Sequence, residues 1–191
     1  MVIVVTGIPG TGKTTVCNEV LKLAEQKRKK IHVVNYGSIM VELSRKRGKN
    51  LHRDELRGSE VAFQRNLQAE AAEIISKKIG GADEDLIVDT HMVIKTGSGY
   101  LAGLPFHVLQ VVNPDMFVLV EAEPHEVLSR RFRDKTRKRD KVLEDDIIEE
   151  TLFSRIMANA CAVLTGASVK IVRNPTGKQI AAAEEVLKFL V

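Results

Sequence analysis

The chain has 191 residues, of which 44% are hydrophobic and 28% charged, and its formal net charge is +4. This composition is typical of a soluble globular protein and excludes collagen-like, low-complexity and wholly disordered chains. No apolar run approaches the ~20 residues needed to cross a bilayer, and residues 1–5 lack the basic lead-in and cleavage site of a signal peptide. We therefore expect a cytoplasmic protein without membrane contact. The two cysteines, Cys17 and Cys161, are too few for a disulfide framework or a zinc site.

Short β-branched runs alternate with longer amphipathic stretches along the chain. We expect strands at residues 2–5, 31–34, 86–88, 116–120 and 169–172, and helices at residues 14–29, 38–47, 59–79, 124–133, 145–164 and 177–190. Because the strands are apolar on both faces, the pattern predicts an α/β fold with a parallel sheet covered by helices on both sides. No long linker divides the chain, so we expect one domain over residues 1–191. Two excursions, at 36–79 and 132–143, are of the kind that build substrate loops and lids.

The segment between the first predicted strand and the first predicted helix carries the most specific motif. Residues 7–14 read Gly-Ile-Pro-Gly-Thr-Gly-Lys-Thr, which is a glycine, four residues and then Gly-Lys-Thr. Glycines let consecutive backbone N–H groups wrap a phosphate, and the following helix adds the positive end of its dipole. Lys13 supplies a full charge, and the Thr14 hydroxyl suits a Mg²⁺ ion that bridges phosphates. The predicted triphosphate site consists of Gly7, Ile8, Pro9, Gly10, Thr11, Gly12, Lys13, Thr14 and Thr15.

Asp89 ends the third predicted strand, where proteins with such a phosphate loop hold a carboxylate near magnesium, directly or through water. Together with the loop, this position favours a metal-binding role for Asp89 over a simple capping role. His91 follows two residues later. It could contact a phosphate or fix Asp89 by a hydrogen bond, and an ordinary loop histidine is the equally weighted alternative.

The acceptor of the phosphoryl group needs a separate argument. A hydroxyl acceptor requires a carboxylate base, whereas a phosphate acceptor is already an anion and needs positioning and cationic clamps. Residues 130–141 carry eight Lys or Arg against two Asp, a local charge of +6 that leaves −2 for the rest of the chain. Arg130 and Arg133 can share a helix face, and Arg137 and Arg139 follow in a stretch able to fold over phosphates. A solvated basic loop and a nucleic-acid tether are the alternatives.

Nearly the whole chain resembles the archaeal-type adenylate kinases, a branch of the nucleoside monophosphate kinases. The resemblance rests on Thr6-Gly7-Ile8-Pro9-Gly10, Asn35-Tyr36-Gly37, Arg53-Asp54-Glu55-Leu56-Arg57, Asp89-Thr90-His91, residues 99–105, residues 119–122 with Pro124, and residues 129–139. It implies a three-layer P-loop nucleotide kinase fold with a five-stranded parallel sheet and a short lid at about 134–143. It also implies an AMP-binding excursion at about 36–79 and a cytoplasmic homotrimer.

The resemblance also implies roles for individual residues. The AMP-side residues would be Tyr36, Gly37, Arg57, His91, Gly103 and Leu104. The catalytic residues would be Lys13, Arg130, Arg133, Arg137 and Arg139, and Asn174 and Pro175 would bracket the ATP adenine. Thr14 and Asp89 would bind the metal. The chain departs from the family at Lys95 and Gly97, where arginine and proline are common, and it lacks the Asp-Gly-Phe-Pro-Arg motif and the zinc-bearing lid of many bacterial members.

The sequence therefore predicts reversible, Mg²⁺-dependent transfer of the ATP γ-phosphoryl group to AMP, giving two ADP. Two alternatives remain open at this stage. One is a P-loop ATPase that docks on a ribonucleoprotein, which would show RNA binding that weakens steeply with salt. The other is a kinase for a different nucleoside monophosphate, because base selectivity depends on a few hydrogen bonds that the sequence does not place.

Overall fold

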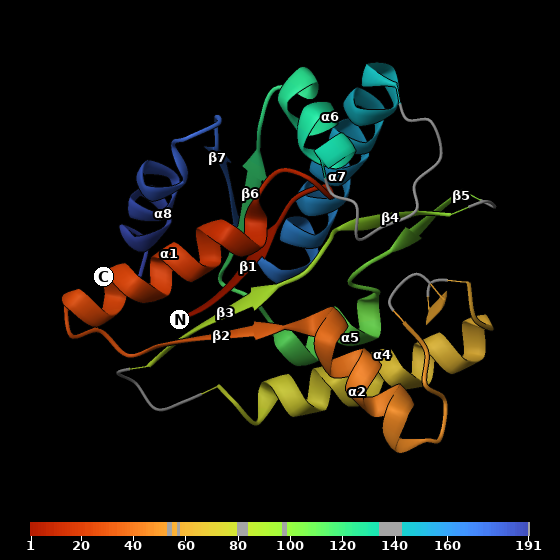
Figure 1. Cartoon of the computed structure of the whole chain (residues 1–191). Helices are drawn as coiled ribbons and strands as arrows, with labels where there is room; N and C mark the ends of the chain where they lie inside the picture. Colours follow the sequence, from red (N-terminus) through yellow and green to blue (C-terminus); the bar gives the residue numbers. More distant parts are fainter. Residues whose placement is uncertain (53–54, 57, 80–83, 97–98, 134–142, 191) are drawn as a thin grey trace.

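The structure is a computed structural model that describes residues 1–52, 55–56, 58–79, 84–96, 99–133 and 143–190. Its centre is a five-stranded parallel sheet with the strand order β2-β3-β1-β6-β7 (Figure 1). These strands are β1 (Val2–Thr6), β2 (Ile31–Asn35), β3 (Asp85–Asp89), β6 (Met116–Glu121) and β7 (Ser168–Arg173). The five predicted strands and their parallel pairing are thereby confirmed.

Alternation along the strands sends side chains to two separate apolar cores. Val2 and Val4 of β1 point to one face, and Ile3 and Val5 point to the other. All four are buried, which is why these strands read as continuous apolar runs rather than as alternating patterns. A parallel sheet with both faces covered follows directly from that composition.

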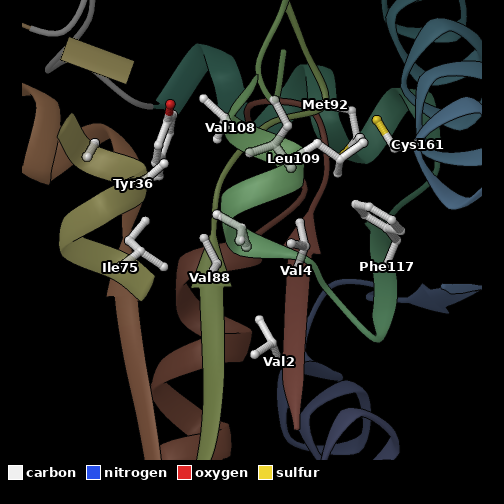
Figure 2. Close-up of a cluster of buried hydrophobic side chains, with 14 of the residues drawn as sticks. Val2, Val4, Tyr36, Ile75, Val88, Met92, Val108, Leu109, Phe117 and Cys161 are labelled. Carbon is white, nitrogen blue, oxygen red and sulfur yellow. The ribbon is translucent and has the colours of Figure 1, made fainter. Parts of the chain in front are cut away.

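Four helices cover the first face. They are α2 (Tyr36–Lys46), α4 (Val61–Ser76), α5 (Phe106–Val112) and α7 (Glu144–Thr165). Figure 2 shows Val4 and Val88 of the sheet turned toward Val108 and Leu109 of α5. Two helices, α1 (Lys13–Gln26) and α8 (Gln179–Leu187), cover the opposite face and pack against each other. The result is the predicted three-layer α/β arrangement.

A short helix, α6 (Pro124–Arg133), follows β6 and packs against α7. A small apolar cluster of Ile8, Val127 and Ile147 joins α6 and α7 to the loop after β1. The basic end of α6 is therefore held beside that loop.

Some details differ from the sequence expectations. The helix expected at 38–47 begins at Tyr36, because the side chain of Asn35 accepts a hydrogen bond from the Ser38 N–H and caps the helix earlier. Among the described residues, three elements were not expected: the helix α5 and the strands β4 (Val93–Thr96) and β5 (Gly99–Ala102), which form an antiparallel hairpin. These elements have seven, four and four residues, too short to show a periodicity.

All five strands of the main sheet run in the same direction, so their carboxyl ends lie at one edge. The loop at residues 7–12, Asn35, Asp89 and Asn174 all stand at or just after these ends. Crevices at this edge are where open α/β sheets bind ligands. Among the described helices, none combines the length and apolarity that a membrane span requires.

Candidate functional site

The loop after β1 has the backbone geometry of an anion-binding loop. Gly12 caps α1 with a φ of 84°, a left-handed conformation that favours glycine. A Cβ atom at this position would also lie 2.5 Å from the Nδ2 atom of Asn174. Both the backbone conformation and the lack of space therefore disfavour a side chain here. The first turn of α1 contains no acidic residue. The positive end of the helix dipole therefore faces the loop without opposition from a carboxylate of the helix's own first turn.

Lys13 and Asp89 form a buried ion pair at the head of α1. Lys13 Nζ lies 2.5 Å from Asp89 Oδ1, and Thr14 Oγ1 donates to Asp89 Oδ2 at 3.2 Å. Asn35 Nδ2 donates to the same Oδ2 at 2.7 Å. Asp89 is only 2% exposed, so these donors offset the desolvation of its charge. The structure thus brings the predicted lysine, threonine and aspartate together.

The buried thiol of Cys17 lies close to this ion pair. Burial, helped by the negative charge of Asp89, raises the pKa of Cys17 to about 12. The thiol is therefore neutral under ordinary conditions and packs as a small apolar side chain, as expected from the sequence.

The three described arginines of α6 have three different surroundings. Arg130 donates to the Thr11 carbonyl oxygen at 3.2 Å and to the Asn174 carbonyl oxygen at 3.0 Å, so it reaches the phosphate loop. Arg131 is buried, binds Glu150 through two hydrogen bonds and donates to the Pro9 carbonyl oxygen at 2.7 Å. Arg133 is exposed and has no partner within the described ranges. The Arg131–Glu150 ion pair was not predicted, because the sequence does not distinguish Arg131 from its neighbour Arg130.

The segment after β7 contacts the phosphate loop. Asn174 is 4% exposed, and its Nδ2 atom donates to the Thr11 carbonyl oxygen at 2.8 Å. Pro175 is exposed beside it. Hydrogen bonds from Thr176 hold the pKa of Glu126 on α6 below its usual range, which ties this segment to α6.

Two pockets open at this edge of the sheet. The first is lined by the phosphate loop, including Lys13, Thr14 and Thr15, together with Arg130 and His91. The second is lined by residues of several elements, including Asn35, Tyr36, Gly37, Asp89, His91 and Gly103. His91 lines both pockets. The two pockets therefore meet at His91, beside the Lys13–Asp89 ion pair.

Four of the six expected AMP-side residues line the second pocket: Tyr36, Gly37, His91 and Gly103. The Tyr36 hydroxyl donates to the Gln68 carbonyl oxygen at 3.2 Å, and burial raises the pKa of Tyr36. Its hydroxyl therefore anchors the ring as a wall against α4. Leu104 is buried in the apolar core rather than exposed in the pocket.

Several expected site residues lie outside the described residues. They are Arg57 on the AMP side and Arg137 and Arg139 in the lid, together with the lid segment 134–142 itself.

Lys95, one of the departures from the family, is engaged by α7. Lys95 Nζ lies 2.9 Å from Asp146 Oδ1 and 3.5 Å from Glu149 Oε2, and the hydrogen bond to Asp146 raises the pKa of Lys95. The neighbouring Tyr100 stacks on Phe153 with ring centroids 4.5 Å apart. The β4–β5 hairpin thus docks on α7, which orients the backbone leading to Gly103.

The chain is similar to known proteins over nearly its whole length. A family model described as an AAA domain matches residues 6–148. The chain is 44% identical over 190 residues to a curated adenylate kinase of Sulfurisphaera tokodaii, with 98% of each chain covered. It is 40% identical over 189 residues to that of Methanocaldococcus jannaschii, covering 99% of this chain and 97% of the relative. It is 45% identical over 174 residues to that of Methanopyrus kandleri, covering 91% and 88%.

Solved structures resemble the chain at much lower identity. A shikimate kinase from Bacteroides thetaiotaomicron superposes with a TM-score of 0.59 at 13% identity, covering 100% of this chain and 98% of that one. The protein TT1252 from Thermus thermophilus superposes with a TM-score of 0.60 at 14% identity, covering 100% and 95%. These two likenesses concern the fold alone.

Proposed function

The chain belongs to the adenylate kinase family and is a phosphotransferase, and from this premise we propose how its two pockets divide the substrates. The pocket at the phosphate loop holds ATP, and the pocket beside α2 and α4 holds AMP. The observation that carries this division is that both pockets share His91 and border the Lys13–Asp89 pair. Two nucleotides bound there would meet with their phosphates facing each other.

On the ATP side, the backbone amides of the loop and the head of α1 bind the phosphates, and Lys13 neutralises their charge. Arg130 lies at the same pocket and holds the Thr11 carbonyl oxygen in place. Arg133, at the exposed end of α6, and Arg137 and Arg139 in the lid would close over the transferred group. Asn174 and Pro175 would bracket the adenine, because they follow β7 directly beside the loop.

On the AMP side, Tyr36, Gly37 and Gly103 line the walls, and Arg57 would clamp the phosphate. An AMP phosphate is already an anion, so the reaction needs no carboxylate base. This fits the state of Asp89, whose oxygens are occupied by Lys13, Thr14 and Asn35 rather than directed at an acceptor. In-line transfer between the two bound nucleotides would then depend on positioning and on positive charge.

Magnesium is part of the proposal. The hydroxyl of Thr14 and the carboxylate of Asp89 lie 3.2 Å apart, and both are oxygen groups of the kind that Mg²⁺ prefers. Because the Asp89 oxygens already accept from Lys13, Thr14 and Asn35, Asp89 would hold the ion through water, or directly once one of these contacts is released. Bound there, the ion would neutralise negative charge on the ATP phosphates.

Both cysteines are buried free thiols, which supports the proposed location in the reducing cytoplasm.

We also propose a homotrimer, and the outer face of α7 supports it. Ile148, Leu152, Ile156 and Val163 fall within about a quarter-turn of one another on the helix and are 52–85% exposed. The buried face of the same helix carries Ala158 and Cys161. A long helix that is apolar on both faces is typical of one that packs against a second chain.

A panel of AMP, CMP, UMP and GMP with Mg²⁺ and ATP tests the proposed function, with ADP formation as the measurement. We expect turnover with AMP to exceed that with each of the others by at least tenfold. Higher turnover with another nucleoside monophosphate would mean that the second pocket binds that nucleotide rather than AMP. Little AMP-dependent turnover, with RNA binding that weakens steeply with salt, would favour the ATPase alternative instead.

A further inference from the structure

Asn35 stands at the contact between the two pockets because of the strand register. β2 pairs in parallel with β3, and Asn35 and Asp89 are opposite each other as the last pair of that register. Side chains at paired positions leave a sheet on the same face, so the two reach one another directly. The Asn35 amide nitrogen accordingly donates to Asp89 Oδ2 at 2.7 Å.

The oxygen of the same amide points into the acceptor side. Asn35 Oδ1 accepts from the Ser38 backbone N–H at 3.0 Å and from the Ser38 hydroxyl at 3.1 Å, so Asn35 is the N-cap of α2. The next two residues of the chain, Tyr36 and Gly37, line the second pocket. One planar side chain therefore connects the start of the helix at the acceptor pocket with the buried carboxylate of the phosphate loop.

The carboxylate that Asn35 holds is the one that places Lys13. Asp89 Oδ1 lies against Lys13 Nζ, while Oδ2 receives both Asn35 and Thr14. The Thr14 contact is the longer of the two, 3.2 Å against 2.7 Å. Lys13 on Oδ1 and Asn35 on Oδ2 thus make the two shortest contacts of the Asp89 carboxylate, so Asn35 helps to fix the orientation in which the carboxylate meets the Lys13 ammonium group.

We infer that Asn35 is a positioning residue that couples the acceptor pocket to the phosphate loop, through the hydrogen bond from its amide to Asp89. A shift of α2 when the acceptor nucleotide binds is passed through this bond to Asp89 and then to Lys13. The inference rests on the proposed assignment of the two pockets.

Two substitutions separate this role from helix capping. Asn35→Ser and Asn35→Asp both keep a side-chain oxygen for the cap, because serine and aspartate cap helices as well as asparagine. Serine is too short to reach Asp89 while capping, so it removes the donor without adding charge. Aspartate has the same length as asparagine but offers Asp89 a carboxylate in place of a donor. The matched control is Ser38→Ala, which removes the hydroxyl hydrogen bond to Asn35 Oδ1 but leaves the backbone cap and the bond to Asp89.

The measurements are kcat with Mg²⁺-ATP and AMP, and the AMP dissociation constant by calorimetry with and without Mg²⁺ and the β,γ-imido analogue of ATP. The ratio of these two dissociation constants measures the coupling between the pockets. We expect both Asn35 variants to lose at least tenfold in kcat and to bring the ratio close to one. Ser38→Ala should stay within twofold of the unmodified chain in both quantities, and thermal unfolding should confirm that all variants are folded.

The inference is overturned if either folded Asn35 variant keeps both the kcat and the coupling ratio, or if the unmodified chain itself shows a ratio of one. An unmodified chain that forms no ADP from ATP and AMP would instead overturn the proposed function. The two failures are therefore distinguishable.

Discussion

At the scale of single residues, the site depends on how each buried charge is paired. Asp89 is almost fully buried, and Lys13, Thr14 and Asn35 all donate to it. Arg131 is also buried and pairs with Glu150. The first pair borders the pockets, while the second fixes the loop from behind through the Pro9 carbonyl oxygen. The Lys13–Asp89 ion pair thus belongs to the proposed binding site, whereas the Arg131–Glu150 ion pair holds the phosphate loop in place.

Lys13→Ala should reduce kcat by about 10²–10³-fold, the usual loss when one preorganised donor to a developing anion is removed. The measurement is ADP formation from saturating Mg²⁺-ATP and AMP. Lys22→Ala is the matched control, because Lys22 lies on the same helix, its side chain is 65% exposed, and among the described residues it pairs with Glu19 alone. Equal activity of Lys13→Ala and Lys22→Ala would remove Lys13 from the mechanism.

Arg131→Ala should lower the free energy of unfolding by about 3–5 kcal/mol, because it leaves the buried Glu150 carboxylate without its partner. Urea denaturation measures the effect. Arg133→Ala, two residues further along and exposed, should change the stability by less than about 0.5 kcal/mol. Its proposed catalytic role predicts a lower kcat instead. Comparable losses of stability in both variants would contradict this separation.

At the scale of elements, short segments carry the site while long ones support it. The β4–β5 hairpin docks on α7 through Lys95 and Tyr100 and leads into Gly103 at the acceptor pocket. Gly103 packs so closely on the preceding segment that a Cβ atom would overlap the His91 carbonyl oxygen. The position of His91 between the pockets is therefore linked to the end of the hairpin.

Gly103→Ala should displace His91 and lower kcat/KM for AMP by on the order of 10²-fold, as small misplacements of bound reactants do. The KM for ATP should change less, because His91 is one part of a lining that otherwise consists mainly of the phosphate loop and the head of α1. Steady-state kinetics with each nucleotide varied in turn measures both. Gly58→Ala is the control, since within the described part of the chain a Cβ atom there meets only the Glu55 carbonyl oxygen, at 3.7 Å. An unchanged kcat/KM in Gly103→Ala would show that His91 tolerates the shift.

At the scale of the whole molecule, the parallel sheet gathers distant parts of the chain at one edge. Lys13 and Asp89 are 76 positions apart, and Arg130 reaches a carbonyl oxygen 119 positions away. The outer face of α7 instead carries a row of exposed apolar side chains, opposite the face that packs into the core. Substrate binding and chain association are thus assigned to different surfaces.

Ile156→Asp should convert the proposed trimer into a monomer, because a charge would be placed in a buried apolar contact. Sedimentation velocity measures the oligomeric state. Ile180→Asp on α8 is the control, since Ile180 is 52% exposed against 56% for Ile156 and lies outside the row on α7. A monomeric unmodified chain, or a trimer that persists in Ile156→Asp, would contradict the proposed interface.

The sequence alone determined the α/β class, the five parallel strands and the phosphate loop. The physical reason is that these features are local: apolar runs buried on both faces, glycines at fixed spacing, and Lys13 and Thr14 at the head of a helix. Asp89 was also found, because it ends a buried strand. Its ion pair with Lys13 was then a consequence of parallel strands ending at one edge.

Only the tertiary structure decided which of similar residues act together. Arg130 and Arg131 are adjacent, yet about 100° of helix rotation sends one to the phosphate loop and the other into a buried pair with Glu150. Likewise, the strand register placed Asn35 opposite Asp89. Neither outcome has a local signature, because burial and register depend on segments that meet only after the chain has folded.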